Sequence, residues 1–200
     1  MNVYDFDETI FEGDCEDRFF KYLSGLAGFR FSRVRYLLLE LISKKMKLMS
    51  RTTARQIQYS FLKRIPDIDS VLEAYWDSSQ KFMKKWYFDV QKPDDVIASG
   101  TPGFLLAPMI RRLKITGCIS TKMDKHSGKI DGFFAVGRYK LEYFEEQFDS
   151  SEIDKFYSDS YLDHFLAEKA KKAYFIHGRN HDQFSDWNDY FRTHRHKCRI

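Results

Sequence analysis

Two aspartates near the start of the chain are separated by one residue, in the stretch Asn2-Val3-Tyr4-Asp5-Phe6-Asp7-Glu8-Thr9. In a strand, residues i and i+2 point to the same side, so the Asp5 and Asp7 carboxylates can face one ligand. Adjacent like charges repel each other, and a cation between them relieves the repulsion. Phosphoryl transfer uses such a site, in which one carboxylate attacks, another moves protons and a divalent metal neutralises phosphate charge. An isolated Asp-x-Asp-x-Thr pattern also fits a solvated turn, so the rest of the chain must decide.

The composition is that of a folded protein with ample core material. The chain has 200 residues, of which 43% are hydrophobic and 17% aromatic, which suits one domain or a core with a small insert. The longest apolar cluster, residues 36–39, is followed by Glu40, so we expect no transmembrane helix. We expect no secretory signal either, because the chain opens almost directly into the Asp pair. Three widely spaced cysteines indicate a reducing compartment, and we expect a cytoplasmic protein.

Apolar runs predict the elements that must position these aspartates. We expect strands at residues 2–6, 96–98, 115–122, 130–136, 153–157 and 173–177, the third and fourth forming a hairpin. Between them we expect helices from Pro102 to Leu113 and over residues 140–147 and 160–172. Strands alternating with helices indicate an α/β fold, with a parallel sheet covered on both faces. Ligands of such sheets bind beyond the carboxyl ends of the strands, where Asp5, Ser99 and Asp159 fall.

A stretch of four helices at residues 12–90 interrupts this alternation, so we interpret it as a helical insert. The first helix starts near Asp14 or Asp17, and the third runs from Thr52 or Thr53 to before Pro66. The second, at residues 31–48, has one apolar and one basic face, and the fourth covers residues 67–88.

Four features with chemical potential follow one another along the chain. They are the Asp pair with Thr9, then Ser99-Gly100 after a strand, then Lys140 at a helix start, and finally Asp159 and Asp163 after a strand. Taken singly, each fits an ordinary cap or surface residue, but together they require four coincidences. This arrangement resembles the haloacid dehalogenase superfamily, in particular its phosphoserine-phosphatase-like branch, over nearly the whole chain. The resemblance implies a Rossmann-like catalytic core at residues 1–12 and 91–200, and a small helical cap domain at residues 13–90.

The resemblance also implies a role for each residue. Asp5 would attack phosphorus and form an aspartyl-phosphate, while Asp7 would protonate the leaving oxygen and then deprotonate water. Ser99 and the amide of Gly100 would bind phosphate oxygens, and Lys140 would offset their negative charge.

A magnesium site is implied by the same resemblance. Asp5, Asp159 and the carbonyl of Asp7 would bind Mg²⁺, because oxygen ligands and a phosphate substrate favour that ion over zinc. Asp163 would orient ligands or pair with the lysine, and Thr9 would tie down the loop.

Substrate choice is left open by the sequence. In the resembled branch the cap supplies specificity, and Asp14 stands where phosphoserine phosphatases carry a longer carboxylate. Arg51 and Arg55 are candidates for holding a substrate carboxylate, against the alternative that both are solvated. The basic face of the helix at residues 31–48 raises contact with a membrane surface and a lipid-phosphate substrate, against the alternative of an ordinary cap helix.

The leading hypothesis is a Mg²⁺-dependent phosphatase acting on a small phosphorylated metabolite. Its alternatives are a phosphatidylglycerophosphatase-like enzyme at a membrane surface and a non-catalytic binding protein with the same fold. We expect no nucleic-acid partner, because the net charge of +4 is small and no binding motif is present. His194, His196 and Cys198 are interpreted as part of a solvated basic tail rather than a metal site.

Overall fold

The computed structural model describes residues 1–26, 50–115, 117–178 and 181–194. The basic helix expected at residues 31–48, on which membrane contact depended, lies outside the described residues, as do His196 and Cys198.

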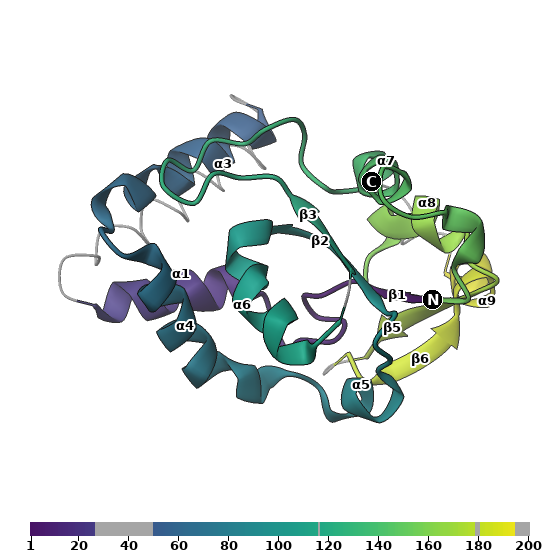
Figure 1. The fold of residues 1–200 in the computed structure, drawn as a ribbon. Coiled ribbons are helices and arrows are strands. Elements are labelled where there is room, and N and C mark those ends of the chain that lie inside the picture. The colour runs from purple at the N-terminus through teal and green to yellow at the C-terminus, as the bar shows by residue number, and fades with distance from the viewer. Residues whose placement is uncertain (27–49, 116, 179–180, 195–200) are drawn as a thin grey trace.

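A single six-stranded sheet forms the centre of the fold (Figure 1). Its strands are β1 (Asn2–Tyr4), β2 (Val96–Pro102), β3 (Gly117–Thr121), β4 (Lys155–Ser158), β5 (Lys172–His177) and β6 (Gln183–Asp186). They lie in the order β3-β2-β1-β4-β5-β6. All neighbours pair in parallel except β6, which runs antiparallel to β5. The predicted α/β class, with a mostly parallel sheet, is confirmed.

Both faces of the sheet are buried, because successive strand residues enter different apolar clusters. Val3 belongs to a cluster with residues of the helices α7 (Arg138–Glu145), α8 (His164–Ala167) and α9 (Trp187–Thr193). Tyr4, the next residue, belongs to a cluster with α6 (Gly103–Leu113) and the helices between β1 and β2. The short apolar runs in β1, β2 and β4, at residues 3–4, 96–98 and 156–157, follow from this two-sided covering.

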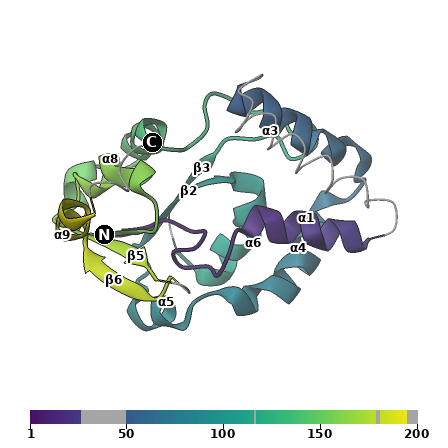
Figure 2. The ribbon, with the colours of Figure 1, turned by 180° about the vertical axis from the view of Figure 1, so that it is seen from behind.

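The stretch between β1 and β2 is helical, as predicted. It contains α1 (Cys15–Gly25), α3 (Arg51–Tyr59), α4 (Ile68–Ser79) and α5 (Lys85–Val90), with short 3₁₀ turns η1 (Ser60–Arg64) and η2 (Gln80–Phe82). Asp14, Ser50 and Asp67 begin α1, α3 and α4, each accepting a hydrogen bond from an N–H three residues ahead. Helices α1, α3 and α4 gather at one end of the molecule and α8 and α9 at the other (Figures 1 and 2). The division into two domains stays a prediction, and one apolar cluster contains residues from both stretches.

The predicted fourth helix at residues 67–88 is interrupted. The chain is extended at Met83 and Lys84, between η2 and α5. Met83 forms an isolated antiparallel bridge with Phe11, and the N–H of Lys84 donates to the carbonyl of Ile10 at 2.8 Å. Pairing with a distant segment has therefore overridden local helical periodicity, which sequence spacing does not register.

The predicted hairpin at residues 115–136 is only partly correct. Its first arm is β3, a full member of the sheet, but residues 130–136 contain no strand. Ile130 makes a single bridge to Met123, and the N–H of Ala135 donates to the Thr121 hydroxyl at 3.1 Å. The second arm therefore crosses to α7 as a loop.

The end of the chain differs most from prediction. The helix expected at residues 160–172 is a 3₁₀ turn, η4 (Tyr161–Asp163), followed by the four-residue α8. The sequence reading missed β6 and α9. All four residues of β6 are exposed or half-buried, so no apolar alternation marks the strand.

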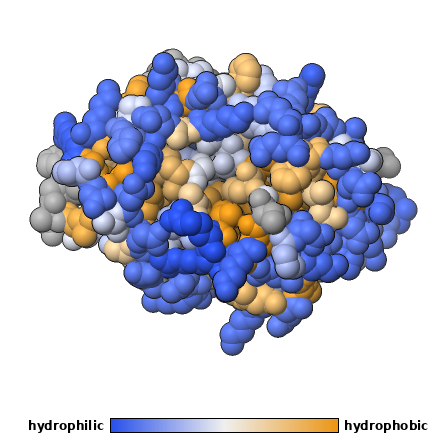
Figure 3. All heavy atoms as spheres, viewed as in Figure 1, coloured by the Kyte–Doolittle hydropathy of each residue, from blue (hydrophilic) through white to orange (hydrophobic). Residues whose placement is uncertain are grey.

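Within the described residues, no helix has the length and apolar character needed to cross a bilayer. On the face seen in Figure 3, hydrophilic residues cover most of the periphery and hydrophobic ones show mainly toward the middle.

Candidate active site

The residues singled out for chemistry meet where three adjacent parallel strands end. Asp5 follows β1, and its N–H donates to the carbonyl of Tyr157 on β4 at 2.9 Å. Asp159 directly follows β4, and Ser99 and Gly100 lie in the last half of β2. Because β1 lies between β2 and β4, Asp5 stands between the other two groups. Residues up to 154 positions apart thus share one edge of the sheet, as predicted.

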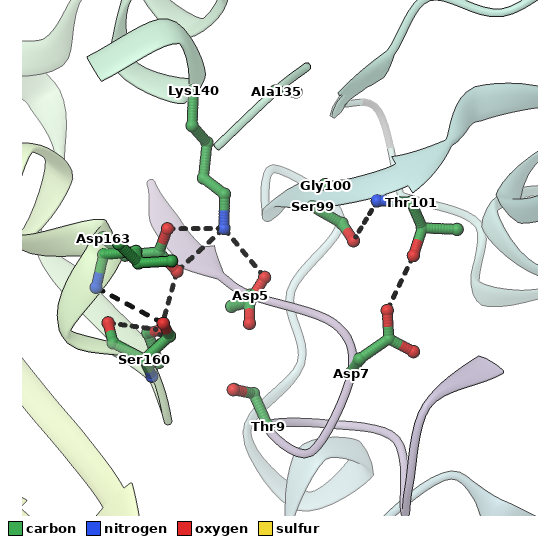
Figure 4. Close-up of polar contacts among 12 residues, drawn as sticks. Asp5, Asp7, Thr9, Ser99, Gly100, Thr101, Ala135, Lys140, Ser160 and Asp163 are labelled. Carbon is green, nitrogen blue, oxygen red and sulfur yellow. Dashed lines mark hydrogen bonds and ion pairs between the residues drawn. The ribbon is translucent and has the colours of Figure 1, made fainter. Parts of the chain in front are cut away.

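Lys140 faces the first aspartate. Its side chain is buried, with the Nζ atom 2.9 Å from Asp5 Oδ1 and 2.7 Å from the Asp163 carboxylate (Figure 4). The hydroxyl of Ser158 also donates to Asp163, at 2.7 Å. Gly137, which directly precedes α7, has φ +58°, a backbone conformation that favours glycine. The structure thus brings Lys140 and Asp163 together, which is one of the two roles expected for Asp163.

Both oxygens of Asp7 accept hydrogen bonds. The N–H of Cys15 donates to Oδ1 at 2.6 Å, and the hydroxyl of Thr101 donates to Oδ2 at 2.7 Å. Figure 4 shows Asp7 turned toward Thr101 and away from the Lys140 side of the site. Sequence reasoning did not single out Thr101, which precedes the helix expected from Pro102; in the structure Thr101 lies in β2, and α6 begins after Pro102. Its position two residues after Ser99, on the same side of a strand, was the available signal.

Thr9 connects the loop after β1 to the end of β4. Its hydroxyl donates to Asp159 Oδ1 and accepts from the Asp159 N–H, both at 3.1 Å, and the residue is fully buried. The predicted tie for this loop is therefore present as a two-way contact.

Ser99 and Gly100 are fixed by their neighbours. The buried hydroxyl of Ser99 accepts from the N–H of Thr101 at 3.1 Å, which leaves its own hydrogen free to be donated elsewhere. The carbonyl of Gly100 accepts from the Thr121 hydroxyl at 2.5 Å. Backbone and hydroxyl donors are thus held in place beside Asp5.

Burial and neighbouring negative charges raise the pKa values of the carboxyl groups at this edge of the sheet. Burial raises the pKa of Asp5 to about 8, opposed by Lys140 and supported by the charges of Asp163 and Asp159. Burial likewise raises the pKa of Asp7 to about 7. For Asp159, burial and then the charge of Asp163 raise the pKa to about 6. Burial alone would lower the pKa of Lys140, but Asp163 and Asp5 raise it well above its usual value, so the lysine is a fixed cation.

The chemistry of these donors fits a hard divalent cation. Asp5 and Asp159 supply carboxylate oxygens from neighbouring strand ends, and the charge of Asp159 raises the pKa of Asp5, so a bound cation would relieve their repulsion. Across the described ranges, no three side chains of the His, Cys, Asp and Glu types are grouped to hold a metal ion. Two carboxylates do not complete the six oxygen ligands that Mg²⁺ takes, so an ion held here would also bind main-chain, water or substrate oxygens.

The predicted substrate residues lie in the helical stretch. Asp14 begins α1, and its charge contributes to the raised pKa of Asp7, which places it beside the site. Arg55 on α3 forms an ion pair with Glu16 of α1, and Arg51 is the first residue of α3. Sequence reasoning did not single out Glu16, whose side chain is 3% exposed. Burial raises its pKa to about 8, with Arg55 opposing the rise.

Comparison with known proteins identifies the family of the chain. The model of the haloacid dehalogenase-like hydrolase family matches residues 3–168. No curated protein matches the chain. A solved protein of unknown function from Bordetella pertussis Tohama I is similar, with TM-score 0.67, 16% identity and coverage of 86% of this chain and 87% of that one.

Two further solved structures are also similar in fold. A phosphoserine phosphohydrolase-like protein from Francisella tularensis has TM-score 0.53 and 15% identity, with 86% of each chain covered. A substrate-bound phosphoserine phosphatase has TM-score 0.50 and 12% identity, with 86% of this chain and 82% of that one covered. The resemblance drawn from the four motifs is confirmed: the chain belongs to the haloacid dehalogenase-like hydrolase family, and its fold is that of the phosphoserine phosphatase structures.

Proposed function

We propose that this protein is a Mg²⁺-dependent phosphatase that hydrolyses a small-molecule phosphomonoester through a covalent phosphoryl group on Asp5. The observation that carries the proposal is the buried Asp5–Lys140–Asp163 arrangement, with Asp7 two residues from the nucleophile. The Lys140 ammonium neutralises part of the negative charge that an incoming phosphate would meet. Without this cation, the two buried carboxylates would repel the phosphate.

The two aspartates divide the reaction between them. In the first step a carboxylate oxygen of Asp5 forms a bond to phosphorus while the bond from phosphorus to the leaving oxygen breaks, and Asp7 transfers its proton to that oxygen. In the second step water attacks phosphorus, Asp7 takes up a proton from the water, and the bond to Asp5 breaks to release inorganic phosphate. A pKa of about 7 suits Asp7 to both duties.

The remaining residues bind and orient. Ser99 and the Gly100 amide would donate to phosphate oxygens, and Lys140 would keep Asp5 directed at phosphorus. Asp5, Asp159 and the Asp7 carbonyl would hold Mg²⁺, which supplies charge neutralisation for the phosphoryl group.

The proposed substrate class rests on the similar structures and on residues of the helical stretch between β1 and β2. The substrate would be a small phosphorylated metabolite, since structures of phosphoserine phosphatases share the fold. Asp14 would face the leaving group, and Arg51 remains a candidate for a substrate carboxylate. Arg55 is a weaker candidate, because its guanidinium already binds Glu16.

Hydrolysis of p-nitrophenyl phosphate tests the assignment. The wild-type protein should turn over with Mg²⁺, lose activity with a chelator and regain it when Mg²⁺ is restored. Asp5→Asn should abolish turnover while keeping the wild-type circular dichroism spectrum, and Asp89→Asn, an exposed change on α5, should leave turnover intact. Hydrolysis by Asp5→Asn at the wild-type rate would remove Asp5 as nucleophile. A wild-type protein that binds Mg²⁺ but hydrolyses no member of a panel of phosphoserine, phosphoethanolamine, sugar phosphates, nucleotides and a lipid phosphate would be a binding protein.

A further inference from the structure

Lys84 joins three segments that are distant in sequence. It lies in the extended link between η2 and α5, at the end of the helical stretch. Its Nζ donates to the carbonyl of Glu8 and, at 2.7 Å, to the carbonyl of His181. Its own N–H donates to the carbonyl of Ile10 at 2.8 Å. One half-buried lysine therefore contacts the loop after β1 twice and the β5–β6 connection once.

The two carbonyls that Lys84 binds belong to residues with an unusual backbone conformation. Glu8 has φ +57° and His181 has φ +45°, and both carry a Cβ atom that disfavours this left-handed region. Such conformations persist only where surrounding contacts hold them. The two residues also bind each other, with His181 Nδ1 2.7 Å from Glu8 Oε2. Lys84, Glu8 and His181 thus form a closed set of contacts, which we call the loop clamp.

The position of Glu8 gives the loop clamp its chemical relevance. Glu8 lies between Asp7 and Thr9, so the peptide units on either side of it carry the proposed general acid and the residue that binds Asp159. The N–H of Glu8 donates to the carbonyl of Gly13 at 3.2 Å, which closes the loop on itself. A rotation at Glu8 would therefore move the Asp7 and Thr9 side chains relative to each other.

We propose that Lys84 is a positioning residue for the reaction, acting through the loop clamp on Asp7 and, through Thr9, on Asp159. This inference rests on the proposed phosphatase function. Lys84 would touch neither substrate nor metal, and its ammonium would fix the left-handed turn from which the general acid projects. The alternative is a lysine that only stabilises the fold.

The dependence on leaving group separates these two roles. An alkyl phosphate needs its leaving oxygen protonated, whereas p-nitrophenolate leaves readily without a proton, so misplacing Asp7 should severely slow phosphoryl transfer to Asp5 only for the alkyl phosphate. This first step is read from kcat/KM, because the later attack of water is common to both substrates. We expect Lys84→Met, which keeps side-chain length but removes the donors, to lower kcat/KM for phosphoserine or phosphoethanolamine, whichever the wild type hydrolyses, on the order of tenfold to a hundredfold. For p-nitrophenyl phosphate the loss of kcat/KM should be at least several-fold smaller. Lys85→Met, a change at the adjacent exposed lysine, is the matched control and should behave as wild type.

Hydrogen exchange supplies a readout that does not depend on turnover. In Lys84→Met the amides of residues 5–14 should exchange faster than in wild type, while those of α7 should not change, and Lys85→Met should leave both segments unaltered. An equal loss of kcat/KM for both leaving groups, or unchanged exchange at residues 5–14, would overturn the positioning role. If the wild-type protein proved to be no phosphatase, the proposed function would fail, and the exchange experiment alone would decide whether Lys84 holds this loop.

Discussion

Replacement of Glu16 by glutamine should change how the stability of the protein depends on pH. Glu16 is 3% exposed, and burial raises its pKa in the folded state to about 8, although Arg55 lies against it. In the unfolded chain its pKa returns to the ordinary value of 4.5. Between these pH values the folded state holds a proton that the unfolded state has lost.

The sign and size of the effect follow from this difference. Because the folded-state pKa is raised, the stabilisation is complete below pH 4.5 and is lost progressively as the pH rises through about 8. At about 1.4 kcal/mol for each pH unit, the full loss approaches roughly 5 kcal/mol. From pH 5 to pH 7 alone, the free energy of unfolding should fall by roughly 3 kcal/mol through this one group. Glu16→Gln cannot ionise and should lack that part of the decline.

Urea denaturation of both proteins at pH 5, 6 and 7 with a chelator present measures the prediction. Other carboxyl groups titrate in this range, so the informative quantity is the difference between variant and wild type. That difference should move in favour of Glu16→Gln by about 1.4 kcal/mol for each pH unit. A difference that does not change with pH would mean that Glu16 is ionised throughout and paired with Arg55, and the reasoning would be wrong. Arg55→Met provides the companion test, because losing the guanidinium should extend the decline to higher pH.

Three further changes test the site and the fold. Lys140→Met should abolish turnover and lower the free energy of unfolding by about 3–5 kcal/mol, because two buried carboxylates lose their cation; unchanged urea midpoints would contradict this. Thr101→Val removes the hydroxyl that binds Asp7 and should lower kcat about tenfold with KM unaltered, so steady-state kinetics with a rise in KM alone would refute it. Gly128→Ala should destabilise by about 2 kcal/mol or more, since φ is +73° and the new Cβ would meet Tyr59 at 2.6 Å; an unchanged melting temperature would disprove the clash.

The parts of the site that sequence reasoning found share one property. Each lies in the last half of a strand, shortly after a strand or near the start of a helix, where polar residues follow a short apolar run. Asp5 and Asp159 follow strands, Ser99 lies in the last half of β2, and the contact of Lys140 with Asp163 was foreseen as one of two options. Thr101, Glu16 and Lys84 escaped because their significance depends on partners 94, 39 and 76 positions away.

The errors in the fold have a related cause. Periodicity correctly predicted helices in the stretch that follows β1, but it carried the fourth helix through Met83 and Lys84, where cross-chain pairing extends the backbone. It also extended a hairpin arm to residues 130–136, whose polar groups instead bond to Thr121 and α3. Local pattern is a weak guide wherever a segment's hydrogen bonds go to a distant partner.

By itself the sequence determined the alternation of strands and helices, the helical insertion after the first strand, and the set of acidic and hydroxyl residues at strand ends. These are local properties, because the spacing of apolar residues and the residues at the ends of an element determine helix or strand within a few positions. Only the tertiary structure decided the order of the strands, the burial that raises the carboxyl pKa values, and the contacts of Lys140, Thr101 and Lys84 with the loop after β1. Those depend on which distant segments approach each other, and burial and electrostatic strength are properties of the assembled fold rather than of any stretch of chain.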